Sequence, residues 1–555
     1  MNEFDVVVVG SGAGGMAAAI TAAADGLSVV IVEKAQQWGG STARSGGGVW
    51  IPGNDILIQQ APADDLESAR KYLRAIVADD ADSGRIDAFI DRGGEAMRFL
   101  TDHSGLDLEW VRGYCDYHPE QPGGRAAGRS CEPKPFDARV LGADLATLQP
   151  FYTRTPMNVV VQQSDYRWLS TGFRHWRGPA RMFRVAGRTA LARIRRQRLV
   201  GLGSALAASL MVGVRQADIP VMLGRAITEL STNGDVVTGV ELSDGTSLAA
   251  RRGVVLACGG FDHNPALRAR HHRAPAGPSL SLGASTNTGD GILAAEKIGA
   301  ATDLMDDAWW APSIPLPKGP WFALAERSLP RSVIVNGQGR RFMNESLPYV
   351  EATHQMFGGA HGKGSGPAEN LPAWLIFDQT YRDRYMFAGK PARAPLPRSW
   401  FANGALTTAD TVEELATTLG IPPANLIQTM SRFNAAARKG VDDEFGRGIS
   451  AYDHYYGDVT NKPNPSLGEI SKPPFYAAQM VPADLGTKGG IVTDANARAL
   501  RSNGEPIAGL YAVGNTSAAV MGHTYAGPGA TIGPALVFGY LAARHIAGTN
   551  IVIQE

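Results

Sequence analysis

The chain has 555 residues, and its 53 Lys and Arg balance 53 Asp and Glu, so it carries no net charge. This balance gives no electrostatic basis for binding nucleic acid and favours a small-molecule partner. At roughly 150 residues per domain, the length predicts two to four structural units. Cysteines occur only at positions 115, 131 and 258. They form no Cys-x-x-Cys pair, and no His lies at metal-ligand spacing, so we expect no metal and a reducing, cytoplasmic location.

The first residues have the order of elements that dinucleotide binding requires. Residues 5–9 (DVVVV) are predicted to form a buried strand, and the turn GSGAGG, which includes Ala13 and Gly14, follows at once. A helix is expected over 16–24 and a second strand over 27–32. In this arrangement Gly10 permits a tight turn, Gly12 lets the backbone approach a pyrophosphate, and Gly15 lets helix and strand pack closely. Glu33, at the end of the second strand, would accept hydrogen bonds from a ribose hydroxyl.

A second glycine- and serine-rich tract follows Glu33 and favours FAD over NAD as the cofactor. Lys34 comes directly after the acid, and residues 39–48 read GGSTARSGGG. A tract of this kind, adjoining the proposed ribose site, is expected to wrap the larger cofactor rather than to be a flexible surface loop. The cofactor contacts predicted from it are Lys34, Gly40, Ser41, Thr42, Ser45, Gly46 and Gly47.

Later parts of the chain predict that the nucleotide-binding domain is assembled from distant segments. Strands are expected over 221–223, 227–230, 236–242 and 253–261, and another over 510–515. The last one ends in Gly514-Asn515, whose backbone would lie along the ribityl chain or pyrophosphate. The helix predicted over 530–546, which begins near Ala530 and Ile532, would direct its N-terminus toward the flavin.

One long apolar window raises the question of membrane contact. Residues 202–223 contain Arg215 and Asp218, so they fall short of an uninterrupted span of about 20 apolar residues. We interpret them as a buried helix followed by a strand. The basic run 193–198 (RIRRQR) ahead of them leaves peripheral membrane contact open. Residues 1–5 lack the basic start and apolar run of a secretion signal, so no export is expected.

The segment 522–533 (GHTYAGPGATIG) places a phenol and a glycine-rich turn just before an apolar helix. Free backbone N–H groups at a helix start carry partial positive charge. The Tyr525 hydroxyl and the Gly529 N–H could therefore both donate to one ligand oxygen. An enzyme that acidifies a carbon next to a ketone needs such a pair of donors.

Four motifs together resemble a known family. They are GGSTARSGGGVWIP at 39–52, TGDG at 288–291, NESLPY at 344–349 and YAGPGATIG at 525–533. The chain is similar to the FAD-dependent 3-ketosteroid Δ1-dehydrogenases, within the fumarate reductase and succinate dehydrogenase flavoprotein superfamily. The resemblance implies an α/β fold: a Rossmann-like FAD-binding domain, split into 1–299 and 478–555, with an α+β catalytic domain inserted at 300–477.

The resemblance also implies a reaction and its residues. The family removes a proton from C2 and a hydride from C1 of a 3-ketosteroid, and the hydride goes to flavin N5. Tyr525 and Gly529 would hold the C3 oxygen, and Tyr349 would take the proton. A buried tyrosine is a poor base at neutral pH, so Tyr117 would assist by donating a hydrogen bond to the phenolate. Tyr114 would line the same pocket. An external electron acceptor, such as a quinone, is expected to reoxidise the flavin.

Three alternatives remain beside this hypothesis. A Δ4-(5α)-dehydrogenase would use the same hydrogen-bond donors to the ketone oxygen and the same base to desaturate a neighbouring bond. A fumarate reductase would carry an arginine where this chain has Tyr349, and an arginine suits an anionic substrate better than an apolar ketone. A non-catalytic flavin- or steroid-binding protein is the third. Outside these motifs, Asp306-Asp307 is interpreted as a solvated acidic pair.

Overall fold

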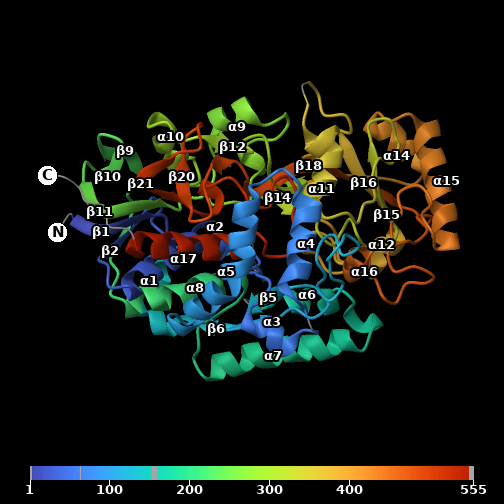
Figure 1. The fold of residues 1–555 in the computed structure, drawn as a ribbon. Helices are drawn as coiled ribbons and strands as arrows, with labels where there is room; N and C mark the ends of the chain where they lie inside the picture. The colour runs from blue at the N-terminus through green and yellow to red at the C-terminus, as the bar shows by residue number, and fades with distance from the viewer. Residues whose placement is uncertain (1–2, 63, 153–158, 365, 549–555) are drawn as a thin grey trace.

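The computed structural model describes residues 3–62, 64–152, 159–364 and 366–548, and contains two large sheets. Figure 1 shows strands from the two chain ends together in one part of the molecule, and the yellow and orange segments gathered in another. This is the α/β architecture predicted from the sequence, with a mixed main sheet and a separate antiparallel one.

The main sheet has eight strands, and five of its central strands run parallel. A β-hairpin and one antiparallel edge strand complete it. Residues from the start, the middle and the end of the chain are therefore hydrogen-bonded side by side, as expected for a domain that is discontinuous in sequence. In spatial order the main path is β20 (Arg498–Leu500), β21 (Pro506–Ala512), β11 (Ser247–Leu256), β1 (Glu3–Val9), β2 (Val29–Glu33) and β8 (Val221–Leu223), with the hairpin β9 (Ile227–Asn233) and β10 (Val236–Leu242) attached to β11.

The predicted glycine turn joins β1 to α1 (Ala13–Ala24). A Cβ atom at Gly10 would lie 2.2 Å from the Ala257 carbonyl oxygen, and one at Gly15 would lie 2.0 Å from the Gly10 oxygen. Only glycine fits these two positions. The small residues of α1 also let it pack directly against α17 (Ile532–Gly548), so the first and last helices together cover one face of the sheet (Figure 1).

The second sheet is antiparallel and lies in the inserted part of the chain. Its strands are β13 (Ala308–Leu316), β14 (Gly319–Phe322), β15 (Ser332–Asn336), β16 (Ala373–Asp378), β17 (Leu406–Ala409) and β18 (Phe475–Thr487). The sequence predicts helices over 411–420 and 426–439, and helices α14 (Val412–Leu419) and α15 (Pro423–Lys439) cover the sheet there. The domain limit predicted at 477 falls inside β18, which pairs with β13, β16 and β17 and continues to Thr487.

The apolar window around residue 210 forms the buried helix α8 (Leu202–Gln216), followed by β8, as the sequence predicted. In the part of the chain that the structure describes, no helix combines the length and apolarity needed to cross a bilayer. The preceding helix α7 (Arg177–Ile194) lies on the outside of the molecule (Figure 1).

Candidate active site

Three tyrosines that are far apart in the sequence meet in the structure. The ring centroids of Tyr117, Tyr349 and Tyr525 lie 5.2 to 5.5 Å from one another, and each pair of rings packs edge to face. The hydroxyl of Tyr117 donates to the hydroxyl of Tyr349 over 3.3 Å. All three side chains are buried. The candidate catalytic phenols that the sequence indicated therefore form one cluster.

A different local structure positions each phenol. Tyr349 is the first residue of helix α11 (Tyr349–Phe357), directly after the N-cap residue Pro348. Tyr117 lies in a loop, and its own backbone N–H donates to the Ala526 carbonyl, 3.0 Å away. The preceding Asp116 fixes that loop, because it accepts hydrogen bonds from the Trp50 indole and from Arg129.

Tyr525 and Gly529 lie together in the turn before α17. Thr531 donates a hydrogen bond to the Tyr525 hydroxyl over 2.9 Å. Burial raises the pKa of Tyr525, while hydrogen bonds from Thr531, Tyr349 and the Gly529 backbone lower it in part. Gly529 has a φ of 101°, and a Cβ there would lie 2.4 Å from the backbone of Gly48. The turn can therefore bring its N–H to the phenol only with glycine at this position.

The electrostatics of Tyr349 bear directly on its predicted role. Burial raises its pKa well above the ordinary value of 10, and neighbouring Tyr525 and Tyr114 raise it further. The hydrogen bond from Tyr117 acts in the opposite direction and lowers this pKa. The sign of the Tyr117 effect is the one expected from the sequence, although burial outweighs it.

Sequence reasoning missed a second group of tyrosines. The short helix α16 (Ala451–Tyr456) brings Tyr452, Tyr455 and Tyr456 to the same cluster. Tyr114 stacks on Tyr455 with ring centroids 4.3 Å apart, and its hydroxyl is hydrogen-bonded to those of Tyr117 and Tyr456. The Tyr-x-x-Tyr-Tyr spacing in this helix was the available signal. The hydroxyl chain thus runs from Tyr349 through Tyr117 and Tyr114 to Tyr456.

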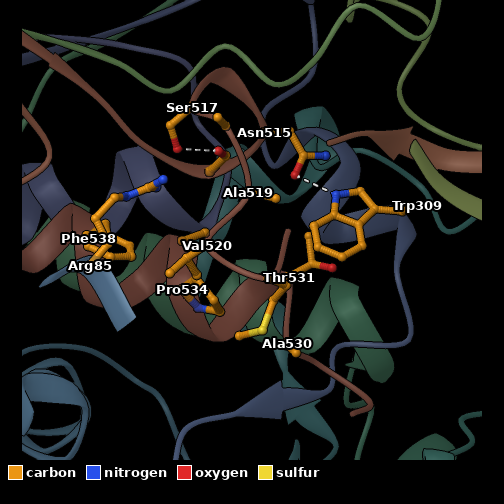
Figure 2. A pocket seen from close by; sticks show the side chains of 14 residues that line it. Arg85, Trp309, Asn515, Ser517, Ala519, Val520, Ala530, Thr531, Pro534 and Phe538 are labelled. Carbon is orange, nitrogen blue, oxygen red and sulfur yellow. Dashed lines mark hydrogen bonds between the residues drawn. The ribbon is translucent and has the colours of Figure 1, made fainter. Parts of the chain in front are cut away.

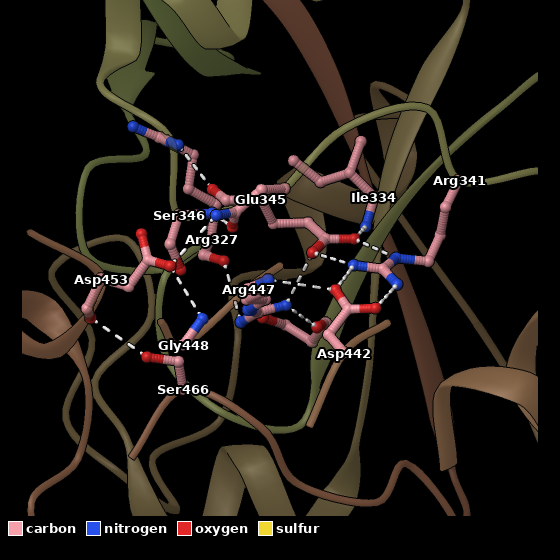
Figure 3. A network of polar contacts seen from close by, with 12 residues as sticks. Arg327, Ile334, Arg341, Glu345, Ser346, Asp442, Arg447, Gly448, Asp453 and Ser466 are labelled. Carbon is pink, nitrogen blue, oxygen red and sulfur yellow. Dashed lines mark hydrogen bonds and ion pairs between the residues drawn. The ribbon is translucent and has the colours of Figure 1, made fainter. Parts of the chain in front are cut away.

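A buried ionic network fixes the segment that leads into Tyr349 (Figure 3). Glu345 accepts two hydrogen bonds from Arg341, each 2.9 Å long, and one of 3.0 Å from Arg447. Arg341 also pairs with Asp442. Because 341–349 and 442–456 both carry site tyrosines, this network holds two walls of the cluster against each other.

The residues predicted to bind the cofactor lie along one continuous strip. The Thr42 side chain accepts a hydrogen bond from Ala13 N–H over 3.0 Å, which ties helix α2 (Gly40–Arg44) to the glycine turn. Lys34 pairs with Asp290, and Ser41 accepts hydrogen bonds from Ala284 and Asn287. Ser45 caps the end of α2 and accepts a hydrogen bond from the Gly47 N–H.

Three glycines of this strip leave room for a cofactor against their backbone. A Cβ atom at Gly12 would have only the Thr42 hydroxyl within 4 Å, and one at Gly40 would have no neighbour within that distance. At Gly514 its nearest neighbour would be the Ala535 Cβ, 3.7 Å away. The backbone at these three glycines therefore borders open space, as expected where a cofactor lies against it. Glu33 accepts hydrogen bonds from Ser11.

A small cavity lies where the strip meets the start of α17 (Figure 2). Asn515, Ala530 and Thr531 line it together with Trp309. The Asn515 side chain accepts a hydrogen bond of 3.1 Å from the Trp309 indole, and the Trp309 ring packs 4.8 Å from that of Tyr525. The predicted cofactor strip and the tyrosine cluster are therefore in direct contact.

The interpretation of Asp306-Asp307 as a solvated pair is wrong for Asp307. This side chain is buried and contacts His354 at 2.9 Å, Lys488 at 3.0 Å and the Trp310 indole. The pKa of Asp307 is lowered well below its ordinary value, because attraction to Lys488 and His354 outweighs the burial that opposes it. Its partners lie too far along the chain for local polarity to reveal them.

The fold, the glycine-rich strip and the adjoining hydroxyl cluster define an FAD-dependent oxidoreductase. The family model described as FAD binding domain matches residues 5–532. FAD is therefore the cofactor.

Relatives with a named activity match this chain over nearly its full length. The chain is 57% identical to a 3-oxosteroid 1-dehydrogenase of Mycobacterium tuberculosis strain H37Rv, over 99% of both chains. It is 56% identical to one from Mycolicibacterium smegmatis, over 99% of this chain and 98% of the relative. The solved structure of 3-ketosteroid delta1-dehydrogenase from Sterolibacterium denitrificans, in complex with 1,4-androstadiene-3,17-dione, matches with a TM-score of 0.93 and 38% identity. That match covers 99% of this chain and 100% of the other. The chain belongs to the 3-oxosteroid 1-dehydrogenase family.

The buried network yields a stability prediction. Glu345→Gln should lower the free energy of unfolding by about 3–5 kcal/mol, because it removes the carboxylate paired with buried Arg447 and one of the two buried carboxylates at Arg341. Thermal and denaturant unfolding would measure it. Glu444→Gln is the matched control: Glu444 contacts the same Arg341 at 3.6 Å but is 46% exposed, so its loss should cost about 0–1 kcal/mol. Equal effects of the two substitutions would contradict the role given to Glu345.

Proposed function

We propose that this protein desaturates the C1–C2 bond of the A ring of a 3-ketosteroid, as a step in steroid breakdown. The observation that carries the proposal is the convergence of Tyr117, Tyr349, Tyr525 and Gly529 beside the FAD-binding strip. A ketone held there would have two hydrogen-bond donors at its oxygen and a phenol close to its α-carbon.

In this proposal Tyr525 and the Gly529 N–H hold the C3 oxygen. The glycine turn holds the two donors next to each other, so both can act on the charge that develops on one oxygen. Polarising the carbonyl acidifies C2. The phenolate of Tyr349 then takes the C2 proton, and the Tyr117 hydroxyl stabilises that phenolate by donating to it.

FAD, when bound, supplies the two-electron acceptor for the hydrogen leaving C1. The chain's part is to hold the cofactor and exclude water. The residues we propose for cofactor contact are Gly10, Gly12, Ala13, Gly14, Gly15, Glu33, Lys34, Gly40, Ser41, Thr42, Ser45, Gly46, Gly47, Gly514, Asn515, Ala530 and Ile532. Tyr114 is proposed to line the substrate pocket, and a quinone-like molecule to reoxidise the cofactor.

We also propose that the chain divides into a split FAD-binding domain and an inserted catalytic domain, with the second boundary after β18. The close rival activity is Δ4-(5α)-dehydrogenation, which the same donors and base would serve. A 3-ketosteroid that already carries the 4,5-double bond, such as 4-androstene-3,17-dione, distinguishes the two, because only the 1-dehydrogenase can still remove hydrogens from its A ring, at C1 and C2.

The reaction itself is the first test. Mixing the FAD-loaded protein with 4-androstene-3,17-dione in the absence of oxygen should bleach the flavin absorbance and yield the 1,4-diene. Tyr349→Phe should lower turnover by about 10²- to 10⁴-fold, because only the proton acceptor is removed, while the steroid dissociation constant changes little. An unbleached flavin in the wild-type protein would refute the proposed function. Turnover retained in Tyr349→Phe would refute the base.

The pH dependence is the second test. Tyr349 must be deprotonated to act and its pKa is raised, so turnover should rise with pH through the alkaline range. Tyr117→Phe removes the hydrogen bond that lowers this pKa, so the rising limb should move to higher pH. Steady-state rates across a pH series would measure the shift. An unmoved limb would show that Tyr117 does not act on the base.

We further propose that the surface formed by residues 163–198 rests on an anionic lipid bilayer. Several large apolar side chains there face solvent: Phe173 (84% exposed), Trp176 (72%), Phe183 (77%) and Ile194 (78%). Between residues 166 and 198 the sequence contains many arginines and no Asp or Glu. Arg174 pairs with Asp458, and Arg181 and Arg188 pair with Asp165. Exposed aromatic and aliphatic groups beside an excess of arginine are typical of helices that lie in the membrane interface.

This surface also adjoins the candidate site. A surface hollow lined by Trp168, Trp176 and Arg177 reaches Tyr455, the ring on which Tyr114 stacks. An apolar substrate dissolved in lipid would thus meet the protein close to the tyrosine cluster.

Vesicle binding tests the lipid contact. The protein should co-sediment with phosphatidylcholine vesicles containing phosphatidylglycerol, and less with phosphatidylcholine alone or at high salt. Phe183→Ser combined with Ile194→Ser should weaken this binding more than tenfold, since each exposed side chain contributes about 1.5–3 kcal/mol when buried. Ile449→Ser, at a 69% exposed position elsewhere, should leave it unchanged. If the double variant instead alters only self-association, the surface is an interface between copies of this chain.

A further inference from the structure

Beside the tyrosine cluster lies a second polar group that the proposed chemistry does not use. It consists of His118, Glu351 and Thr524. Thr524 donates to the Glu351 carboxylate over 3.0 Å, and the His118 ring nitrogen lies 3.1 Å from the same carboxylate oxygen and 3.2 Å from the Thr524 hydroxyl. The three residues therefore contact one another pairwise and form a triangle.

The position of these residues in the chain is what makes the triangle informative. His118 follows Tyr117 directly, and Thr524 directly precedes Tyr525. Glu351 lies two residues after Tyr349, in the first turn of α11. Each corner of the triangle therefore belongs to a segment that carries one phenol of the site, and contacts between corners set the distances between those segments.

Further bonds fix the same corners. The His118 backbone N–H donates to the Tyr72 hydroxyl, which itself donates to the Ala526 carbonyl over 2.7 Å. From the other side, Lys488 donates to the Thr524 carbonyl over 3.1 Å while it pairs with Asp307. The residue before Tyr525 is thus held through both its side chain and its backbone.

Burying the Glu351 carboxylate at this position costs folding free energy. Its Oε2 is buried and, among the residues that the structure describes, has no hydrogen-bond partner. Attraction to His118, His354 and Lys488 nonetheless outweighs burial and lowers the pKa of Glu351 to about 2, so the anion persists. A buried charge with an unsatisfied oxygen destabilises the fold unless its other contacts compensate. The compensating hydrogen bonds of Glu351 come from His118 and Thr524, which belong to the segments that carry Tyr117 and Tyr525.

From this geometry we infer that His118, Glu351 and Thr524 are positioning residues, which set the spacing of the Tyr117, Tyr349 and Tyr525 phenols. The inference rests on the proposed function. None of the three has a role in holding substrate or moving the C2 proton. Thr524 fixes the position of the adjacent Tyr525. Glu351 links Thr524 to helix α11, which begins with Tyr349. A displacement of about 1 Å between the base Tyr349 and the carbonyl-oxygen donor Tyr525 can cost about 10²-fold in rate.

Thr524 gives the sharpest test, because isosteric and conservative variants both exist. Thr524→Val keeps the shape and removes the donor, so turnover should fall by about 10- to 100-fold while the steroid dissociation constant changes less than about threefold. Thr524→Ser keeps the hydroxyl and should restore turnover to within about threefold of wild type. A purely structural role would lower the melting temperature without separating turnover from binding in this way.

A double-mutant cycle tests whether the corners act as one unit. Glu351→Gln alone should reduce turnover, and Thr524→Val combined with Glu351→Gln should be no worse than the more damaging single variant, because both break the same link. Asp80→Asn is the matched control. Asp80 pairs with His523 at 2.8 Å, next to Thr524 in the chain, and packs against Gly522. Among the described residues its hydrogen bond goes to His523 and not to a corner of the triangle, so turnover should stay within about twofold.

The outcomes separate this inference from the proposed function. If wild-type protein with bound FAD does not turn over 3-ketosteroids, the proposed function fails, whatever the variants do. If wild type turns over and Thr524→Val keeps more than half of that rate, or if the Thr524 and Glu351 effects multiply independently, the positioning role fails alone. Flavin absorbance and melting temperature, measured for every variant, show that the proteins compared are folded and loaded.

Discussion

The site depends on one constraint: several phenol hydroxyls are buried where few other polar groups can reach them. A buried hydroxyl without a partner is costly, so four of these groups satisfy one another, whereas the Tyr452 hydroxyl has no partner among the described residues. The chain from Tyr349 through Tyr117 and Tyr114 to Tyr456 is the result. Hydrogen bonds in such a network polarise one another in a low dielectric. The same arrangement also brings the proposed base, Tyr349, close to the proposed donor to the carbonyl oxygen, Tyr525, with ring centroids 5.4 Å apart.

Burial has opposite consequences for the two roles proposed for Tyr525 and Tyr349. A neutral Tyr525 is the better donor to a carbonyl, and burial keeps it neutral by raising its pKa. Tyr349 needs the opposite state, and burial works against it. Hydrogen bonds from neighbours lower both pKa values in part: Tyr117 donates to Tyr349, and Thr531 and the Gly529 N–H donate to Tyr525. The bond from Tyr117 is the one that favours the charged form required of the proposed base.

Much of the fold follows from local patterns, and the site follows from them only in part. The glycine turn after β1, the hairpin at 227–242 and the helices at 412–439 are encoded by contiguous residues, so the sequence predicts them well. The phenols at 117, 349 and 525 were found through family motifs. The tyrosines of α16 were not found, and neither was the burial of Asp307. Their partners are remote along the chain, and no short-range pattern reports which distant segment will cover a side chain.

The position of β18 in the inserted sheet affects how the molecule must be made. This strand pairs with β13, β16 and β17, yet it is the last of its sheet to be synthesised. The main sheet likewise places β21, near the C-terminus, against β11. Neither sheet can close before most of the chain has left the ribosome. Pairings between residues so distant in sequence form slowly and leave unpaired strand edges exposed meanwhile. The nascent protein should therefore require chaperone protection through most of its translation.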